Sequence, residues 1–169
     1  MTRRLLGWCR PGLTAGSVPE IDVAALRERG IEALLLDLDN TLVRWRSREV
    51  PEEVLAWVRQ ASDAGLRLCI VSNAGSARRV APVARRLGIP FLVRAAKPRR
   101  RGFRHAAARL KLPPERVAVI GDQVFTDVVG GNRAGMLTIL VPPVDRSHEF
   151  VTTRLMRLLE RALHRHIHG

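Results

Sequence analysis

Residues 31–43 read Ile-Glu-Ala-Leu-Leu-Leu-Asp-Leu-Asp-Asn-Thr-Leu-Val, and this stretch decides the fold. Its apolar run, residues 33–36, ends abruptly at Asp37, and Asp39 and Thr41 follow at alternate positions. A run this short and this apolar is typical of a strand that is buried on both faces. Two carboxylates this close together at the end of a strand repel each other unless a cation offsets their charge. The stretch therefore predicts a cation site at one edge of a sheet.

The bulk composition predicts one domain with a real core. The chain has 169 residues, and 46% of them are hydrophobic, which is ordinary for a globular protein. We expect a single domain over residues 1–169, with a loop-like arm at residues 1–20 and a last helix at residues 149–167. Cys9 and Cys69 are too few for a disulfide framework and too far apart for a metal knuckle.

Targeting signals are not evident in the sequence. No apolar run approaches the roughly 20 residues that a membrane-spanning helix needs. The apolar stretch near the N-terminus is short and is interrupted by Gly7, Cys9 and Arg10, which is unlike a signal peptide. We therefore expect a cytoplasmic protein, either free or held peripherally at a membrane.

The net charge of +13 is the unusual feature of the composition. An excess of this size favours an anionic partner, which could be a phosphorylated substrate, a nucleic acid or an anionic membrane surface. Arginines that are simply solvated on helix faces would explain the same charge equally well. The charge therefore does not choose among these partners, and the oligomeric state also stays open.

Short apolar runs alternate with helical patterns along the chain. The expected strands are residues 33–36, 66–71, 91–93, 117–120 and 137–141. This alternation predicts an α/β fold in which a five-stranded parallel sheet carries helices on both faces. If strands two and three lie on one side of strand one, and strands four and five on the other, the order is 3-2-1-4-5. We expect this three-layer, Rossmann-like arrangement.

Polar side chains follow the ends of successive strands. In chain order they are Asp37, Asp39, Thr41, Ser72, Asn73, Lys97, Asp122 and Asp127. In open α/β sheets, ligands bind outside the carboxyl ends of the strands, where the strand order reverses, so these side chains should meet in one crevice. Several carboxylates beside a lysine and a hydroxyl predict Mg²⁺ next to a phosphate, because Mg²⁺ prefers hard oxygen ligands and often keeps a substrate phosphate.

Each of these residues also has a plainer explanation. Ser72 and Asn73 are of types that commonly cap helices, and Lys97 stands in a run of arginines that solvation alone would explain. Asp127 could cap the following helix, and Asp37 could belong to a capped turn. Their ordered occurrence after successive strands favours a common site instead.

At this point the motifs resemble a known family. Asp-Leu-Asp-Asn-Thr at 37–41, Ser72, Lys97-Pro98 and Gly-Asp-Gln-Val-Phe-Thr-Asp at 121–127 look like the four signature segments of the haloacid dehalogenase (HAD) superfamily. The resemblance spans roughly residues 31–141. The longer segment at 121–136, with the segment at 37–43, is similar to the short bacterial YqeG-like group of type IIIA. That group is related to mitochondrial-type phosphatidylglycerophosphatases.

The resemblance implies roles for the four carboxylates. Asp37 would be the nucleophile that forms an aspartyl-phosphate, and Asp39 would be a general acid and then a general base. Mg²⁺ would be held by Asp37, by the backbone carbonyl of Asp39 and by Asp122. Asp127 would support the metal, directly or through water.

The resemblance also implies how the phosphate is held. Ser72 and Lys97 would bind phosphate oxygens and offset the charge of the transition state. Thr41 would orient the loop after strand one, and Asn73 is a further candidate contact. All four residues are therefore expected at the phosphate.

Many members of this superfamily carry a cap domain, and this chain has no room for one. The gaps at residues 41–72 and 73–97 each hold only one helix and one strand. An open site suits a large or surface-bound phosphate ester, because a lid is what normally excludes water. The helix expected at 149–167 either covers the sheet with a basic outer side or lies on an anionic membrane.

The leading functional hypothesis is a Mg²⁺-dependent phosphatase that hydrolyses a phosphate monoester through an aspartyl-phosphate. Phosphatidylglycerophosphate is the preferred substrate, on the resemblance and the charge. One alternative is a phosphatase that acts on nucleic-acid ends or on a phosphoprotein. A non-enzymatic RNA- or ribosome-binding module on the same fold is the other.

Overall fold

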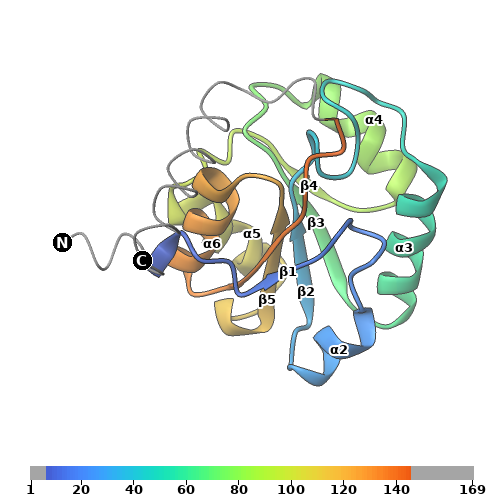
Figure 1. The fold of residues 1–169 in the computed structure, drawn as a ribbon. Helices are drawn as coiled ribbons and strands as arrows, with labels where there is room; N and C mark the ends of the chain where they lie inside the picture. Colours follow the sequence, from blue (N-terminus) through green and yellow to red (C-terminus); the bar gives the residue numbers. More distant parts are fainter. Residues whose placement is uncertain (1–6, 146–169) are drawn as a thin grey trace, which may run out of the picture.

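A six-stranded parallel sheet of order β1-β6-β5-β2-β3-β4 forms the centre of the computed structural model, which describes residues 7–145 (Figure 1). The strands are β1 (Leu13–Thr14), β2 (Ala33–Leu36), β3 (Arg67–Val71), β4 (Phe91–Leu92), β5 (Val117–Gly121) and β6 (Leu137–Leu140). Every neighbouring pair is parallel. The predicted order of five strands is confirmed, and β1 extends the sheet by one strand.

β1 corrects the prediction that the whole N-terminal arm is a loop. Leu13 and Thr14 pair with Ile139 and Leu140 of β6. The amide of Gly12 also donates to Thr138 Oγ1 at 3.1 Å. A strand of two residues is too short to carry an alternating pattern, which is why the sequence does not reveal it.

β2 occupies the middle of the sheet. Its last residue, Leu36, pairs with Ile70 on one side and Ile120 on the other. All four residues of β2 are buried, as expected for a strand covered on both faces. The backbone amide of Asp37 still donates to the carbonyl of Ile120 at 2.9 Å, so the sheet fixes the start of the loop that follows.

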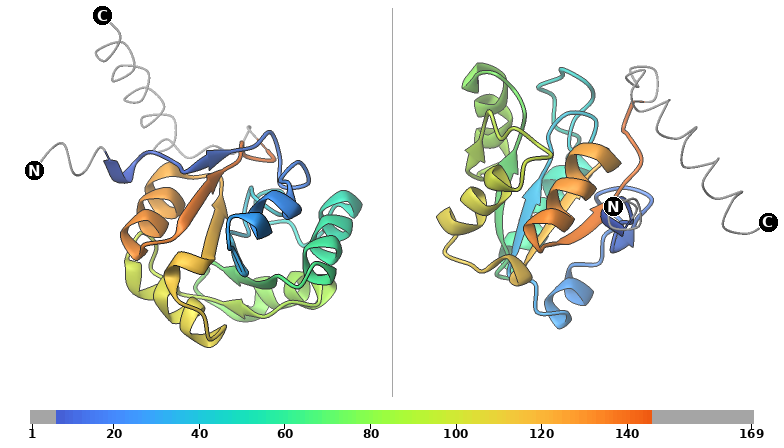
Figure 2. Two further views of the ribbon diagram at one scale, coloured as in Figure 1. Left: turned by 90° about the horizontal axis from the view of Figure 1, so that it is seen from below. Right: turned by 90° about the vertical axis from the view of Figure 1, so that its left-hand side faces the viewer.

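Helices cover both faces of the sheet, which confirms the three predicted layers (Figure 2). One layer contains α2 (Val23–Glu28), α3 (Glu52–Asp63) and α4 (Ala77–Leu87), and the other contains α5 (Arg100–Arg109) and α6 (Val129–Ala134). Alternate residues of β2 pack against the two layers of helices. Leu34 and Leu36 pack in the core with α3 and α4, while Leu35 packs with α5.

Two glycines allow α6 to lie close to its neighbours. A Cβ atom on Gly130 would lie 2.3 Å from the ring of Phe103, and one on Gly131 would lie 2.6 Å from the methyl group of Thr138. These contacts are shorter than any side chain tolerates, so the helix approaches the sheet and α5 only because both positions lack a Cβ.

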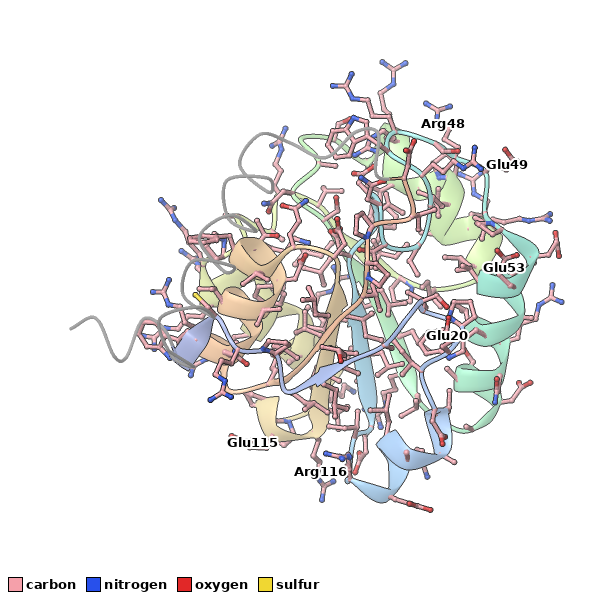
Figure 3. The ribbon with its side chains drawn as sticks, viewed as in Figure 1. Glu20, Arg48, Glu49, Glu53, Glu115 and Arg116 are labelled. Carbon is pink, nitrogen blue, oxygen red and sulfur yellow. The ribbon has the colours of Figure 1, made fainter. Side chains whose placement is uncertain are left out.

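The described chain inserts no cap domain. Only α3 lies between β2 and β3, and only α4 lies between β3 and β4. The loops at the carboxyl ends of the strands include Arg48, whereas Glu115 and Arg116 lie at the opposite edge (Figure 3). No helix within residues 7–145 is long and apolar enough to cross a membrane. The predicted helix at residues 149–167 lies outside the described residues.

Candidate active site

The predicted site residues come together at the carboxyl edge of the sheet. The loop after β2 supplies Asp37 and Asp39, the loop after β4 supplies Lys97, and the segment after β5 supplies Asp122 and Asp127. A pocket of about 270 Å³ opens between these segments. It is lined by Asp37, Asp39, Trp45, Ser72, Asn73, Ala74, Arg79, Lys97, Gln123 and Thr126.

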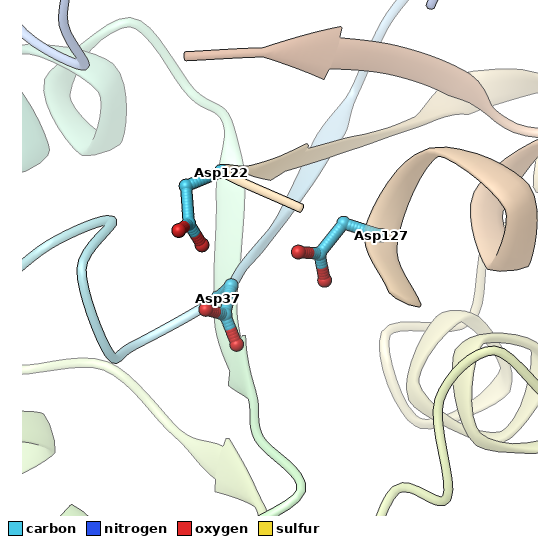
Figure 4. Close-up of side chains that lie close together, drawn as sticks. All are labelled: Asp37, Asp122 and Asp127. Atoms are coloured by element: carbon cyan, nitrogen blue, oxygen red, sulfur yellow. The ribbon is translucent and has the colours of Figure 1, made fainter. Parts of the chain in front are cut away.

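Asp37, Asp122 and Asp127 form a cluster of carboxylates (Figure 4). One oxygen from each lies within 4.8 Å of the others, and all three residues are largely buried. Three hard oxygen donors this close together, sheltered from water, are the donor set that Mg²⁺ prefers. The residues present therefore fit the predicted divalent cation.

Burial and mutual repulsion disfavour the charged forms of these carboxylates. Burial raises the pKa of Asp37 to about 6, with Lys97 opposing the rise and Asp127 adding to it. Burial also raises the pKa of Asp122 to about 8, and the charges of Asp37 and Asp127 add to it. The cluster is therefore short of positive charge, which a bound cation would supply.

Lys97 supplies part of that positive charge. Its ammonium donates to Asp37 and, at 2.7 Å, to Asp127. Burial lowers the pKa of Lys97, but the carboxylates of Asp127 and Asp37 outweigh it and hold the pKa above its ordinary value. The lysine is consequently a fixed cation in contact with the expected nucleophile.

Thr41 lies against the same cluster. Its hydroxyl oxygen is 3.2 Å from an oxygen of Asp122 and 3.4 Å from an oxygen of Asp37. A hydroxyl has one proton to donate, so the two carboxylates share it. Thr41 lies outside the pocket lining described above, so its predicted contact with phosphate remains a prediction.

Asp39 has different partners from the other three carboxylates. The guanidinium of Arg79, near the start of α4, donates to both of its oxygens. The backbone amide of Arg46 donates to Asp39 Oδ1 at 3.2 Å. The hydrogen bond to Asp39 raises the pKa of Arg79. The side chain of Asp39 is thus paired with Arg79 rather than included in the cluster, and the metal contact expected for its backbone carbonyl remains a prediction.

Asn73 holds the segment that carries Lys97. Its amide group donates to the carbonyl of Lys97 at 3.1 Å and accepts from the amide of Lys97 at 2.8 Å. The Lys97–Pro98 peptide bond is cis. Ser72 lines the pocket beside it, and its hydroxyl accepts from the amide of Ala74 at 3.1 Å. Asn73 therefore positions the lysine, and Ser72 borders the space that the phosphate would occupy.

The chain after β5 holds Asp127 in place. Residues Val124–Val128 form one π-helical turn, η2, before α6. The amide of Gln123 and the hydroxyl of Thr126 donate to Asp127 Oδ2 at 3.3 and 3.2 Å. A Cβ atom on Gly121 would lie 2.3 Å from the carboxyl carbon of Asp127, so only glycine fits there. The turn thereby directs Asp127 toward Lys97.

A comparison with known families agrees with this geometry. Residues 19–135, more than half of the chain, match the haloacid dehalogenase-like hydrolases. The chain belongs to that family. Every site residue predicted for this HAD hydrolase lies within the matched segment.

Two curated relatives indicate which group of HAD hydrolases this chain resembles. It is 42% identical over 138 residues to the Bacillus subtilis (strain 168) protein named "Probable phosphatase YqeG", covering 82% of this chain and 79% of that protein. It is 30% identical over 158 residues to "Phosphatidylglycerophosphate phosphatase 1, chloroplastic" from Chlamydomonas reinhardtii. That match covers 89% of this chain but 59% of the algal protein. The predicted resemblance to the YqeG-like group is confirmed.

A solved structure supports the fold of the HAD hydrolase. The cobalt-bound form of deoxy-D-mannose-octulosonate 8-phosphate phosphatase from Haemophilus influenzae is similar, with a TM-score of 0.53 and 16% identity. The match covers 67% of this chain and 69% of that one. At this identity the likeness speaks for the fold alone, and it agrees with the predicted HAD-like arrangement.

Sequence reasoning missed five residues that line the pocket of the HAD hydrolase. They are Trp45, Ala74, Arg79, Gln123 and Thr126. The signal for Arg79 was weak, because it is one of many arginines in the chain. Its position in the first turn of the helix after Ser72 and Asn73 was the one available clue.

Proposed function

We propose that this HAD hydrolase is a Mg²⁺-dependent phosphatase that hydrolyses a phosphate monoester through an aspartyl-phosphate on Asp37. The observation that carries the proposal is that Asp37 contacts a buried lysine, belongs to the carboxylate cluster and lines a pocket. The expected phosphatase class is confirmed by the family match and by the names of the relatives. The roles of the individual residues stay part of the proposal.

Asp37 and Asp39 share the chemistry in two steps. In the first, an oxygen of Asp37 forms a bond to phosphorus while the bond from phosphorus to the leaving oxygen breaks, and Asp39 gives that oxygen a proton. The products are an alcohol and the aspartyl-phosphate. In the second, water attacks phosphorus, Asp39 takes a proton from the water, and the bond to Asp37 breaks. Inorganic phosphate leaves and both carboxyl groups return to their first state.

The metal would be held by Asp37, Asp122 and Asp127, with the backbone carbonyl of Asp39. When bound, Mg²⁺ would offset the carboxylate charge and hold a phosphate oxygen. Lys97 keeps a positive charge beside Asp37, so phosphate oxygens meet a cation where the new bond forms. Ser72 offers a hydroxyl to the same oxygens, and Asn73 fixes the backbone of the lysine.

Phosphatidylglycerophosphate is the substrate that we propose. The algal relative is named for this substrate, and the absence of a cap within the described chain leaves the pocket accessible to a large ester. A lipid-borne substrate also explains why a chain with a net charge of +13 would work beside an anionic surface. We therefore propose a cytoplasmic protein that acts peripherally at a membrane, with residues 1–169 as a single domain.

Exposed side chains beside the site support this location. Among the described residues, two large hydrophobic side chains are exposed, Phe125 at 43% and Val144 at 46%, and both belong to segments next to site residues. Phe125 precedes the pocket residue Thr126, and the amide of Val144 donates to the carbonyl of Asn40, the neighbour of Asp39. Exposed Arg44 and Arg48 lie in the loop after β2. Apolar tips among arginines are the groups that insert at an anionic interface.

A matched pair of variants tests the reaction. With Mg²⁺, the wild type should hydrolyse p-nitrophenyl phosphate and phosphatidylglycerophosphate in detergent, releasing inorganic phosphate. Asp37→Asn should lower both rates by at least about a thousandfold, because it removes the nucleophile. Asp63→Asn, an exposed change on α3, is the control. Full activity of Asp37→Asn would contradict the mechanism, and loss of the lipid activity alone would contradict the substrate.

A further inference from the structure

The pocket contains two cations that serve different carboxylates. Among the described residues, its basic lining side chains are Lys97 and Arg79. Lys97 contacts Asp37, where the phosphoryl group is expected to bind. Arg79 contacts Asp39 instead. The proposed mechanism gives Lys97 a role and leaves Arg79 without one.

Both oxygens of Asp39 are engaged in this structure. Arg79 donates to each of them, and the amide of Arg46 donates to Oδ1 as well. Asp39 must take up a proton from solvent and turn that oxygen toward the leaving group before it can act as the acid. The ion pair with Arg79 therefore has to open, at least at one oxygen, when a substrate enters.

A guanidinium that leaves a carboxylate in a sheltered pocket needs another anion. The side chain of Arg79 is only 25% exposed, so water alone replaces the carboxylate poorly. Its planar fork matches the oxygens of a phosphate as well as those of a carboxylate. An anion of the substrate, on the side where Asp39 acts, would satisfy it.

We infer that Arg79 is a specificity residue, which exchanges Asp39 for a second anionic group on the leaving group of the substrate. The inference rests on the proposed phosphatase function. Asp39 protonates the leaving oxygen, so the partner of Arg79 lies on the leaving-group side, away from Lys97. The group that fits is a phosphodiester a few bonds from the phosphate that is removed. When the substrate binds, its second anion replaces Asp39 on Arg79. The contact that selects the substrate therefore also releases Asp39.

Two kinds of molecule carry a phosphodiester next to a terminal phosphate. One is a lipid headgroup, and the other is the end of a nucleic acid. The water-soluble probes are glycerophosphoglycerol phosphate for the first and 5′-phosphorylated thymidine dinucleotide for the second. Glycerol 3-phosphate has the monoester without the diester and is the reference.

The test compares kcat/KM for the three compounds with Mg²⁺ in the wild type, Arg79→Gln and Arg79→Lys. We expect the wild type to prefer glycerophosphoglycerol phosphate, the headgroup of the proposed substrate, over glycerol 3-phosphate by about ten- to a hundredfold, the range for a charged hydrogen-bonded pair. Arg79→Gln should abolish most of this preference, mainly through KM, and Arg79→Lys should restore part of it. Arg78→Gln, the exposed neighbour on α4, should keep the preference. The preferred probe identifies the source of the diester.

Other results would overturn the inference. An equal loss on all three compounds would mean that Arg79 only positions Asp39, and a wild type without preference would exclude a second anion site. Calorimetric binding of glycerophosphoglycerol and of the dinucleoside phosphate, which have the diester but no monoester, gives a readout besides activity. If the wild type hydrolyses none of the compounds, the proposed function fails. Binding that Arg79→Gln abolishes would then still support the anion site, and absence of binding would overturn it.

Discussion

The hydroxyl of Thr41 lies 3.2 Å from the carboxylate of Asp122, although the two residues are 81 positions apart in the chain. The same hydroxyl is 3.4 Å from Asp37. One threonine thus connects the loop after β2 with the end of β5, and both of its partners are expected metal ligands. The geometry of the cluster depends on this contact as well as on the sheet.

Thr41→Val should remove the hydroxyl contact with the carboxylate cluster while nearly preserving the shape of the side chain. Loss of a hydrogen bond to a buried carboxylate is expected to lower the free energy of unfolding by about 1.5–3 kcal/mol and to weaken Mg²⁺ binding. Thr41→Ser keeps the hydroxyl and should stay within about 1 kcal/mol of the wild type. Urea unfolding and calorimetric titration with Mg²⁺ measure both effects. Equal behaviour of the valine and serine variants would show that the hydroxyl is unimportant.

Lys97→Met should be more damaging than any change of a surface ion pair. It leaves the buried carboxylates of Asp37 and Asp127 without their common cation, and breaking a buried pair costs about 3–5 kcal/mol. Arg86→Gln, which removes the exposed pair with Glu52, should cost less than about 1 kcal/mol. Urea unfolding without Mg²⁺ gives both values. A similar cost for the two variants would contradict the burial of charge that we describe.

The raised pKa of Asp122 makes the stability of the metal-free protein depend on pH in the acidic-to-neutral range. The carboxyl ionises near pH 3.8 in the unfolded chain but near 8 in the folded one, so unfolding releases a proton between these values. The stability of the metal-free protein should therefore fall as pH rises through this window. Asp122→Asn cannot release that proton and should show a flatter profile, measured by thermal unfolding in EDTA from pH 5 to 8.5.

Mg²⁺ should reverse this trend, because it binds the ionised carboxylate. At a concentration of 100 Kd it should stabilise the protein by about 2.7 kcal/mol. At a fixed Mg²⁺ concentration, the rise in Tm should be larger at pH 8 than at pH 6. A rise in Tm that is independent of pH, or that persists in Asp122→Asn, would argue against this metal site.

A separate prediction concerns the exposed side chains of Phe125 and Val144. Phe125→Ser with Val144→Ser should reduce binding to vesicles of phosphatidylglycerol and phosphatidylcholine by about tenfold, because two apolar side chains no longer insert. Arg116→Gln changes the opposite edge of the sheet and should have little effect (Figure 3). Cosedimentation measures the binding. If all three proteins bind alike, the surface that meets the membrane is elsewhere.

Most of the fold could be predicted because short apolar runs alternate with helical patterns along the chain. Five strands are predicted from short apolar runs, and the order 3-2-1-4-5 is predicted on the condition that strands two and three lie on one side of strand one. β1 could not be predicted, because two residues carry no period and their pairing depends on β6 across more than 120 positions. Pro82 lies inside α4, which nevertheless runs unbroken from Ala77 to Leu87.

The residues of the site could be predicted from the sequence, but several of their contacts could not. The positions of Asp37, Lys97 and Asp122 after successive strands brought them to one edge. The sequence could not show that Lys97 contacts two carboxylates, because that depends on the turn at Val124–Val128. The pairing of Asp39 with Arg79 also escaped prediction, since no local pattern marks one arginine among many.

The short strand β1 affects how readily the edge of the sheet could pair with another chain. Without it, β6 would present a row of free backbone amides and carbonyls, which is the template on which chains associate edge to edge. Two paired residues occupy that row, and the side chain of Asn132 ties the preceding segment down through the carbonyls of Trp8 and Arg10. The border that remains is too short to recruit another strand. The pairing of β1 with β6 therefore removes one edge at which another chain could pair with the sheet.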